Sequence, residues 1–488
     1  MTGAEPERAV LESVPTELFI AGEWRGASGG GRLPVEDPST GEPLVEVADG
    51  QLEDALDALQ AASSAQGEWS QHPPRERGEI LRRAYQAIVD RADELALLMT
   101  LEMGKSVAES RAEINYAAEF FRWFSEEAVR IHGRYMVNTT GKGRILTMRQ
   151  PVGPCVFVTP WNFPTAMGTR KLAPAIAAGC TMVVKPAQQT PLSMLALARI
   201  LQDSGLPAGV LNVITAKHSG AVIEPLLKDP RTRKLSFTGS TEVGRTLIEQ
   251  SAHQVLRVSM ELGGNAPFLV FEDADLDAAV EGALLAKMRN VGEACTAANR
   301  FHVHESVGGE FSRRLAERMG ALKVGRGTDP TVDVGPLIDD AQREKVTELV
   351  GDAVDRGARV LVGGGPLDGP GYFFEPTVLA DVPGEARVLE EEIFGPVAPV
   401  ASFSTDEQAV AAANRTEYGL VAYVYTRDLS RAFHVCEGIE TGMIGLNQGV
   451  VSNPAAPFGG VKQSGYGREG GFEGIGEYLE TKYVALGV

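Results

Sequence analysis

Cysteine is scarce in this sequence. Its 488 residues include only four cysteines, Cys155, Cys180, Cys295 and Cys436, and they form neither a CxxC pair nor a regular spacing. Disulfide frameworks and zinc sites both need clustered cysteines, so both are disfavoured. We therefore expect no bound metal and a reducing compartment, the cytoplasm.

A basic excess is missing as well. The chain has 65 acidic and 46 basic residues, a formal net charge of -19, and no basic block. A polyanion such as nucleic acid, or an acidic membrane surface, would be repelled by this balance. Any anion that the protein binds must therefore be held by local groups.

Long hydrophobic runs are also absent. The longest weakly polar stretch, LAPAIAAGCTMVV, covers residues 172–184 between two lysines. Its 13 residues fall short of the roughly 18 needed to cross a bilayer. The first twenty residues lack the basic and then apolar order of a secretory signal and are too acidic for a transit peptide. We expect no membrane association.

The sequence does contain alternating strand and helix patterns. Residues 154–160 and 181–187 are short apolar runs typical of buried strands, and the segment 167–179 between them is compatible with a helix. A third strand pattern covers 234–240, and Ser240 is a plausible N-cap for the helix that follows. This order predicts an α/β fold with a parallel sheet covered by helices, and the length allows roughly two to four domains.

The second half repeats the pattern with different content. A strand follows Glu261, a helix pattern covers 273–290, and another strand begins near residue 301. Cys295 therefore lies in a connection between a helix and a strand, where functional residues are common. The last residues, EYLETKYVALGV, predict a strand with no evident partner in their own chain. Addition to a neighbouring subunit's sheet would protect such a strand, and the hairpin pattern at 131–150 has the same peripheral character.

Three residues are candidates for chemistry, each with a structural alternative. Cys295 is surrounded by small and polar residues in NVGEACTAANR, which leaves a nucleophile and a small core residue about equally favoured. Glu261 could be a base or a solvated turn residue, and Asn162 an oxyanion donor or an Asx turn before Pro164. The turn GSTEVG at 239–244 lacks the GxGxxG spacing of a dinucleotide site.

Taken together, seven motifs resemble those of the aldehyde dehydrogenase superfamily. They occur in the same order as in that superfamily, and the resemblance extends over essentially the whole chain. They are VTPWNFP, KPAQQTPLS, FTGSTEVGR, MELGGNAP, NVGEACTAANR, EEIFGPV and PFGGVKQSGYGRE. The segment 101–133 and the motif KMRN are most similar to the succinate-semialdehyde dehydrogenase branch. The resemblance implies a Rossmann-like cofactor domain (1–130 and 151–260), an α/β catalytic domain (261–436) and a small β oligomerisation element with the C-terminal segment (131–150 and 437–488). It also implies a homodimer or homotetramer.

The resemblance also implies a mechanism. Cys295 would be the nucleophile, Glu261 the general base, and Asn162, together with the Cys295 backbone N–H, the donor to the oxyanion. Hydride leaves for the nicotinamide, and water activated by Glu261 hydrolyses the thioester. Because Glu261 favours hydrolysis, an acylating CoA-dependent enzyme is disfavoured, and the three residues together disfavour a non-catalytic scaffold.

Cofactor residues follow from the same resemblance: Trp161, Lys185, Gln188, Gly239, Ser240, Glu392 and Phe394. Many relatives that use NAD have a glutamate at the position of Gln188. A carboxylate there repels a ribose 2'-phosphate, whereas the neutral amide beside Lys185 does not. We expect that NADP is accepted in addition to NAD and is preferred.

The implied substrate is a small anionic aldehyde, succinate semialdehyde. Arg170, Arg289 and Ser452 match the branch's carboxylate contacts, and paired guanidinium groups suit a carboxylate. Pairing with the helix dipole is the alternative role for Arg289. Glutarate semialdehyde or an aliphatic aldehyde is the alternative substrate.

Two positions near Cys295 depart from the family pattern. Glu293 replaces a common glutamine, and a carboxylate two residues from the nucleophile would raise the thiol pKa unless its side chain points away. Ala297 stands where some members carry a second cysteine, so a disulfide switch is not expected.

Overall fold

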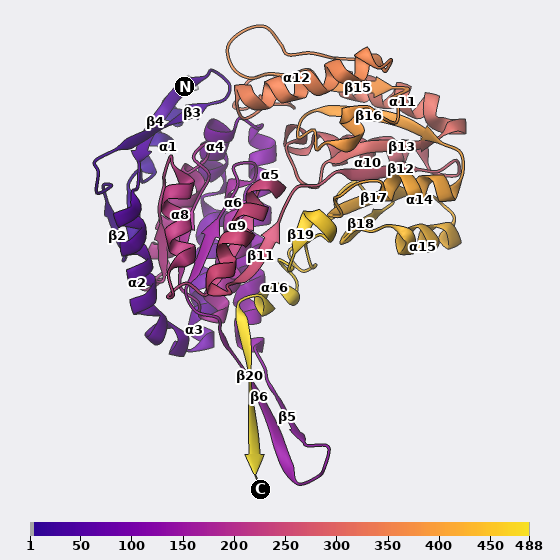
Figure 1. The fold of residues 1–488 in the computed structure, drawn as a ribbon. Helices are drawn as coiled ribbons and strands as arrows, with labels where there is room; N and C mark the ends of the chain where they lie inside the picture. Colours follow the sequence, from indigo (N-terminus) through magenta and orange to yellow (C-terminus); the bar gives the residue numbers. More distant parts are fainter. Residues whose placement is uncertain (1–3, 488) are drawn as a thin grey trace.

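The computed structural model describes residues 4–487, which form two lobes and a projecting arm (Figure 1). The first lobe is built on an eight-stranded sheet whose central strands are parallel. In spatial order the strands are β19 (Gly465–Tyr466), β11 (Arg257–Glu261), β10 (Lys234–Thr238), β7 (Cys155–Val158), β8 (Met182–Lys185), β9 (Leu211–Val213), β1 (Leu18–Ile20) and β2 (Glu23–Arg25). The strand patterns predicted at 154–160, 181–187 and 234–240 are confirmed.

Helices cover both faces of this sheet. They are α1 (Ala4–Ser13), α2 (Leu52–Gln71), α3 (Pro74–Asp90), α4 (Ala92–Met103), α5 (Val107–Glu127), α6 (Pro164–Ala178), α7 (Leu192–Asp203), α8 (Ser219–Lys228) and α9 (Thr241–Ser251). Ser240 caps α9 as predicted, because its side chain accepts a hydrogen bond from the Val243 N–H at 3.3 Å. The helix predicted at 167–179 starts three residues earlier, at Pro164, because proline suits the first turn.

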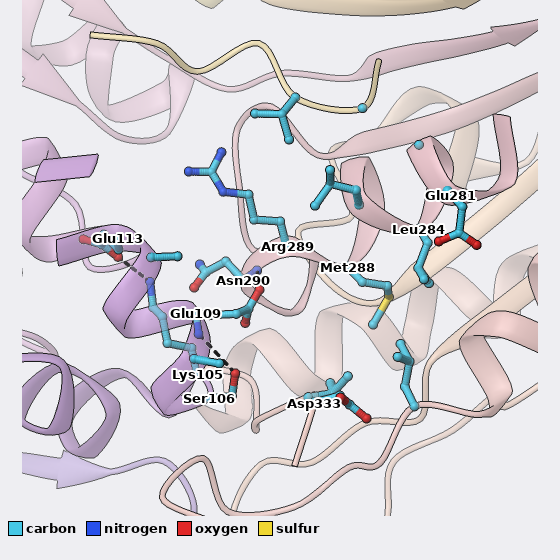
Figure 2. A pocket seen from close by; sticks show the side chains of 18 of the residues that line it. Lys105, Ser106, Glu109, Glu113, Glu281, Leu284, Met288, Arg289, Asn290 and Asp333 are labelled. Carbon is cyan, nitrogen blue, oxygen red and sulfur yellow. Dashed lines mark hydrogen bonds and ion pairs between the residues drawn. The ribbon is translucent and has the colours of Figure 1, made fainter. Parts of the chain in front are cut away.

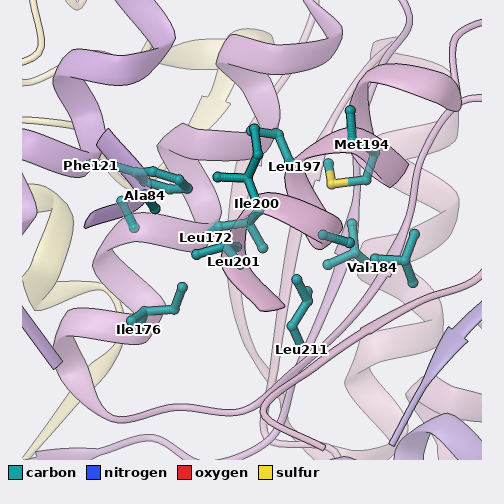
Figure 3. Close-up of a cluster of buried hydrophobic side chains, with 14 of the residues drawn as sticks. Ala84, Phe121, Leu172, Ile176, Val184, Met194, Leu197, Ile200, Leu201 and Leu211 are labelled. Carbon is teal, nitrogen blue, oxygen red and sulfur yellow. The ribbon is translucent and has the colours of Figure 1, made fainter. Parts of the chain in front are cut away.

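Neighbouring residues of each strand face opposite cores. Val156 joins a cluster with α2 and α8, whereas Phe157 joins the larger cluster formed with α3, α5, α6 and α7. Figure 3 shows part of this larger cluster, where Leu172 and Ile176 of α6 lie near Leu197, Ile200 and Leu201 of α7. Each such buried side chain contributes roughly 1.5 to 3 kcal/mol, so the central strands are held firmly.

The second lobe has a seven-stranded sheet. Its strands are, in order, β14 (Arg359–Val362), β15 (Thr377–Ala380), β16 (Val397–Phe403), β13 (Ala298–His304), β12 (Ala266–Val270), β17 (Val421–Tyr425) and β18 (Met443–Leu446). Its helices are α10 (Leu276–Met288), α11 (Glu305–Gly320), α12 (Asp340–Asp355), α13 (Arg387–Glu390), α14 (Asp406–Asn414) and α15 (Leu429–Gly438). The order of strand, helix and strand predicted around Cys295 is confirmed.

The C-terminal strand has a partner within its own chain. β20 (Leu479–Gly487) pairs antiparallel with β6 (Gly143–Pro151), which also pairs with β5 (Arg134–Val137). The expectation that this strand lacks a partner in its own chain was wrong, because its partner lies more than 300 residues earlier in the sequence. These three strands form the projecting arm at the bottom of Figure 1.

The remaining elements are short. A hairpin joins β3 (Arg32–Asp37) to β4 (Glu42–Ala48), and α16 (Glu473–Gly476) precedes the arm. Four short 3₁₀ turns are η1 (Ala128–Arg130), η2 (Ala252–Gln254), η3 (Arg289–Gly292) and η4 (Lys462–Ser464). β18 and β19 show that residues after 436 contribute to both large sheets, and the domain limits drawn from the sequence stay predictions. Among residues 4–487, no helix has the length and apolar character that a bilayer crossing requires.

Candidate active site

A cavity of about 220 Å³ lies where the two lobes meet, and it brings the predicted catalytic residues together. Cys295, Glu261 and Asn162 all line it. So do five of the seven predicted cofactor residues, namely Trp161, Gly239, Ser240, Glu392 and Phe394. Residues separated by more than 200 positions in the sequence therefore share one small space.

The parallel strands explain this convergence. Glu261 is the last residue of β11, Gly239 directly follows β10, and Trp161 and Asn162 follow β7. The carboxyl ends of parallel strands meet at one edge of a sheet, which is where such sheets bind ligands. Cys295 reaches the same edge from the second lobe, in the connection between η3 and β13.

The backbone before Cys295 is strongly bent. Asn290, Val291 and Gly292 have consecutive positive φ angles of 55°, 58° and 78°. Such a conformation is a genuine outlier for the β-branched Val291. At Gly292 a Cβ atom would lie 2.2 Å from the Gly395 carbonyl oxygen, so only glycine fits there. Strained backbone of this kind is concentrated at functional sites.

Asn162 is held beside the loop that carries the nucleophile Cys295 (the nucleophile loop). Its side-chain amide Nδ2 donates to the Glu293 carbonyl oxygen at 2.9 Å, and the residue is only 5% exposed. An amide nitrogen carries two hydrogens. One hydrogen is thus used for positioning, and the second is left for an oxyanion in the cavity.

The Cys295 thiol is in its neutral form at rest. Burial raises its pKa to about 12, and the carboxyl groups of Glu392 and Glu261 add to this effect. The Arg170 guanidinium opposes it most strongly, followed by that of Arg289. Attack on an aldehyde therefore requires a base that takes the thiol proton.

Glu261 can supply such a base. The carboxyl group is 3% exposed, and its Oε2 atom has no hydrogen-bond partner among residues 4–487. Burial raises its pKa well above the usual range, and Glu469 raises it further, whereas Arg170 and Lys171 lower it. A raised pKa suits a group that must accept a proton from a thiol or from water.

The Glu293 side chain does not line the Cys295 cavity. It is fully buried, and its Oε1 atom accepts a hydrogen bond from the Ile338 N–H at 3.0 Å. Burial raises the pKa of this carboxyl well above its usual value. The alternative in which the Glu293 side chain points away from Cys295 therefore agrees with the structure.

Contacts link the three predicted substrate residues, of which Arg170 is buried and Arg289 and Ser452 are half-buried. Arg289 donates to the Ser452 hydroxyl at 3.1 Å and lines a second cavity of about 880 Å³, shown in Figure 2. Arg170 is 1% exposed, donates to the Tyr116 hydroxyl at 2.6 Å and lies 3.7 Å from the Glu469 carboxylate. Tyr116 lies within 6 Å of both guanidinium groups and so connects them.

The two cavities share a wall. Phe163 lines both, and the Arg289 guanidinium lies 4.9 Å from the centre of its ring. The larger cavity therefore ends beside the Cys295 cavity, on the side that carries Arg289. A substrate and a nicotinamide could approach Cys295 from different directions.

The predicted cofactor residues fit a dinucleotide. Lys185 is 4% exposed, takes part in no ion pair within residues 4–487, and has its pKa lowered to about 8 by burial. A buried cation without an acidic partner suits a ribose or phosphate oxygen. Gln188 is exposed and lines a hollow of about 290 Å³ together with Lys217 and Arg32.

At the other end, Glu392 accepts a hydrogen bond from the Gly264 N–H at 3.0 Å. Burial raises the pKa of this carboxyl to about 7. The Phe394 ring stands edge-on to Trp161 at 5.4 Å between centres. These groups offer an acceptor for ribose hydroxyls and an apolar wall for a nicotinamide.

Several residues around the site were missed from the sequence. Lys105, Tyr116, Asn290 and Glu469 all contact predicted site residues. Asn290 stands inside the motif NVGEACTAANR and Glu469 ends the motif PFGGVKQSGYGRE, whereas Lys105 and Tyr116 lie in the segment 101–133, so the resemblance covered all four without assigning them a role. Among residues 4–487 no cluster of three acidic, cysteine or histidine side chains could hold a metal ion.

Comparison with known proteins agrees with this geometry. The model of the "Aldehyde dehydrogenase family" matches residues 24–484. The chain belongs to this family. As an aldehyde dehydrogenase it is an enzyme that oxidises aldehydes with NAD or NADP, and the fold predicted from the sequence is confirmed.

Individual relatives are similar along almost their whole length. The chain is 59% identical to a succinate-semialdehyde dehydrogenase of Paenarthrobacter nicotinovorans, over 91% of this chain and 98% of that one. It is 48% identical to a glutarate-semialdehyde dehydrogenase of Pseudomonas putida, over 97% of this chain and 98% of that one. A crystal structure described as an NADP-dependent enzyme of Escherichia coli superposes with a TM-score of 0.96 at 49% identity, covering 97% of this chain and 98% of that one.

Proposed function

We propose that this aldehyde dehydrogenase oxidises succinate semialdehyde to succinate with reduction of NAD(P). The observation that carries the proposal is the Arg289 guanidinium, which donates to Ser452 and lines the 880 Å³ cavity that adjoins the Cys295 cavity. A guanidinium with free donors there can bind the distal carboxylate while the aldehyde points toward Cys295. The relative of the same name at 59% identity supports the choice.

In the proposed reaction Glu261 takes the thiol proton, and the Cys295 thiolate attacks the aldehyde carbon. The oxyanion that forms is held by the free N–H of the Asn162 amide and by the Cys295 backbone N–H, donors worth about 3 to 4 kcal/mol each in such sites. When bound, the nicotinamide would supply the acceptor for the hydride that leaves the aldehyde carbon as the oxyanion collapses to a thioester on Cys295. Glu261 passes the proton taken from the thiol to solvent. Its carboxylate then deprotonates a water, which attacks the thioester and releases the acid.

NADP preference is a separate proposal. Lys217 and Arg32 supply positive charge in the hollow that Gln188 lines, and Gln188 itself is neutral and exposed. Glu36, Glu102 and Asp339 line the same hollow and offset these cations, so the proposal rests on the absence of a carboxylate at Gln188. We expect both cofactors to support turnover, with a higher kcat/KM for NADP.

One experiment tests substrate and cofactor together. Steady-state kinetics are measured for succinate semialdehyde, glutarate semialdehyde and propanal, each with NAD and NADP. We expect kcat/KM to be highest for succinate semialdehyde with NADP and to fall steeply for propanal, which lacks the carboxylate. Equal values for propanal and succinate semialdehyde would remove the argument from Arg289.

Glutarate semialdehyde is the second candidate substrate. The relative from Pseudomonas putida at 48% identity carries this name, and the longer aldehyde has the same carboxylate. The 880 Å³ cavity has room for one more methylene. The same kinetic panel separates the two, because the preferred chain length gives the higher kcat/KM.

We further propose that the protein is a homodimer or homotetramer assembled through the arm. Tyr135, Met136 and Val137 of β5 are each about half exposed or more, and Tyr483 of β20 is 60% exposed. Such an apolar strand edge favours association with another copy. Light scattering after size exclusion gives the mass directly, and a monomer would contradict the proposal.

The four free cysteines suit the cytoplasm, which we propose as the compartment.

A further inference from the structure

Two backbone carbonyls beside Cys295 are held by three side-chain donors, one of which, the Asn290 amide, bonds both. The Glu293 carbonyl oxygen accepts from the side-chain nitrogens of Asn162 at 2.9 Å and Asn290 at 2.8 Å. The Asn162 carbonyl oxygen accepts from the same Asn290 nitrogen at 3.0 Å and from Lys105 Nζ at 2.8 Å. Both hydrogens of the Asn290 amide are thus used, one on each side of the gap between Asn162 and the nucleophile loop.

All the donors in this network are buried. Asn290 and Lys105 are each 1% exposed, and the Asn290 Oδ1 atom has no partner within residues 4–487. A buried acceptor without a partner is unfavourable, so the side chain is not there for stability alone. Lys105 pairs with Glu113 at 2.6 Å, and Glu113 accepts from the backbone of Thr165 and Ala166 in the first turn of α6. The network is therefore tied to the helix that directly follows Asn162.

Asn290 also suits the backbone at its position. Its φ of 55° is left-handed, a conformation that asparagine tolerates better than most residues. Its backbone N–H donates to the Glu109 carboxylate at 2.6 Å. Figure 2 shows Lys105, Glu109 and Glu113 on one wall of the larger cavity, with Asn290 facing them from the other lobe. Asn290 consequently joins the two lobes at the point where the oxyanion donors meet.

We propose that Asn290 is a positioning residue for aldehyde oxidation, acting through Asn162. Its side chain donates to the backbone carbonyls of Asn162 and Glu293 at once. This fixes the plane of the Asn162 side-chain amide relative to the nucleophile loop. The second N–H of that amide is thereby directed at the oxyanion. Lys105 holds the same carbonyl from the opposite side. The proposal rests on the proposed function, because it concerns the donor that this reaction uses.

The expected consequence is a loss in kcat rather than in binding. Asn290 lines the larger cavity, but both N–H groups of its side chain are used by the Asn162 and Glu293 carbonyls, and it bonds neither Arg289 nor Ser452 through that side chain. A displaced oxyanion donor weakens only the interaction made during reaction, and misplacement by about 1 Å can reduce a rate about 100-fold. KM for the aldehyde and Kd for NADP should change little.

A double-mutant cycle on the full-length protein tests the proposal. Asn290→Ala should lower kcat about 10- to 100-fold, and Asn162→Ala should lower it at least as much. If Asn290 acts through Asn162, the double variant should be no more than about twofold slower than Asn162→Ala alone. Losses that multiply in the double variant, or an Asn290→Ala kcat within twofold of the parent protein, would overturn the inference.

Two further measurements separate positioning from collapse of the loop. Alkylation of Cys295 by iodoacetamide, followed by mass spectrometry, needs the thiolate but not the oxyanion donor, and its rate should stay within about twofold in Asn290→Ala. A large change in that rate would mean that the loop itself has moved, which contradicts the inference. Asn290→Ser retains one hydrogen-bond donor, so its kcat should lie between those of Asn290→Ala and the parent protein. This variant replaces Asn290→Ala in the test if Asn290→Ala does not fold.

Asn212→Ala is the matched control. Asn212 is a buried asparagine of β9 whose side-chain nitrogen also donates to two carbonyl oxygens, those of Met182 and Gly209. It should lower Tm about as much as Asn290→Ala does while leaving kcat near that of the parent. If the parent protein oxidises no aldehyde, the proposed function fails; if it does and the cycle is additive, only the role of Asn290 fails.

Discussion

Replacement of Glu293 by glutamine should stabilise the protein increasingly as the pH rises. The Glu293 carboxyl is fully buried, has one hydrogen bond from Ile338, and has a second oxygen, Oε2, without a partner within residues 4–487. Burial raises its pKa well above that of a free glutamate. The folded protein therefore keeps the Glu293 proton to a higher pH than the unfolded chain, which loses it near pH 4.3.

The sign follows from proton counting. When the pKa of a glutamate is higher in the folded protein than in the unfolded chain, its full contribution to the free energy of unfolding is present below the pKa of the unfolded chain. This contribution declines as the pH rises toward the pKa of the folded protein. In that window the parent protein loses about 1.4 kcal/mol of unfolding free energy per pH unit at this site, and Glu293→Gln does not. For a chain of 488 residues, the unfolding entropy is large enough that a change of 1 kcal/mol in the free energy of unfolding shifts Tm by about 1 °C. The Tm difference should grow by about 1.4 °C per pH unit.

Thermal unfolding of both proteins in matched buffers from pH 5.5 upward measures this difference. Exposed Glu53, replaced by glutamine, serves as the control, and its Tm difference from the parent should not grow with pH. The kcat of Glu293→Gln should stay within about twofold of the parent at neutral pH, since the Glu293 side chain does not line the Cys295 cavity. A pH-independent Tm difference would show that Glu293 is ionised in the folded protein.

Four further outcomes test the proposed chemistry. Glu261→Gln should lower kcat at least 100-fold in steady-state kinetics, because the base for both the Cys295 thiol and the hydrolytic water is lost. Arg289→Ala should lower kcat/KM for succinate semialdehyde about 30-fold through KM, the equivalent of about 2 kcal/mol, and leave propanal unchanged. Gln188→Glu should shift the kcat/KM ratio from NADP toward NAD, because the new carboxylate repels a 2'-phosphate. Alkylation of Cys295 without cofactor should accelerate up to at least pH 10, since its thiol pKa is about 12, and Arg170→Met should slow it. A plateau below pH 8 would contradict that pKa.

The sequence predicted the elements that carry local signals. Alternating apolar runs identified β7, β8 and β10, and the long motifs identified the residues that now line one cavity, although Cys295, Glu261 and Asn162 had equal structural alternatives when considered singly. Their assembly depends on parallel strands ending at one edge, which short-range spacing does not encode. Motif similarity supplied that missing information.

Other features were beyond the sequence because they depend on contacts between distant segments. The partner of β20 is β6, and the alternating pattern of β20 alone does not name it. The protonation of Glu293 depends on burial against Ile338, so its charge could not be assigned from its position two residues before Cys295. Asn290 carried no chemical signal at all until its two acceptors were located.

Burial raises the pKa of both reacting groups, the Cys295 thiol and the Glu261 carboxyl, and this links stability to catalysis. The higher pKa makes the Glu261 carboxylate a stronger base toward the thiol and toward water. The same low polarity strengthens each hydrogen bond to an oxyanion formed in the cavity, beside donors that are already oriented. Arg170 opposes the rise in both pKa values, and we infer that it keeps the proton transfer from Cys295 to Glu261 within reach.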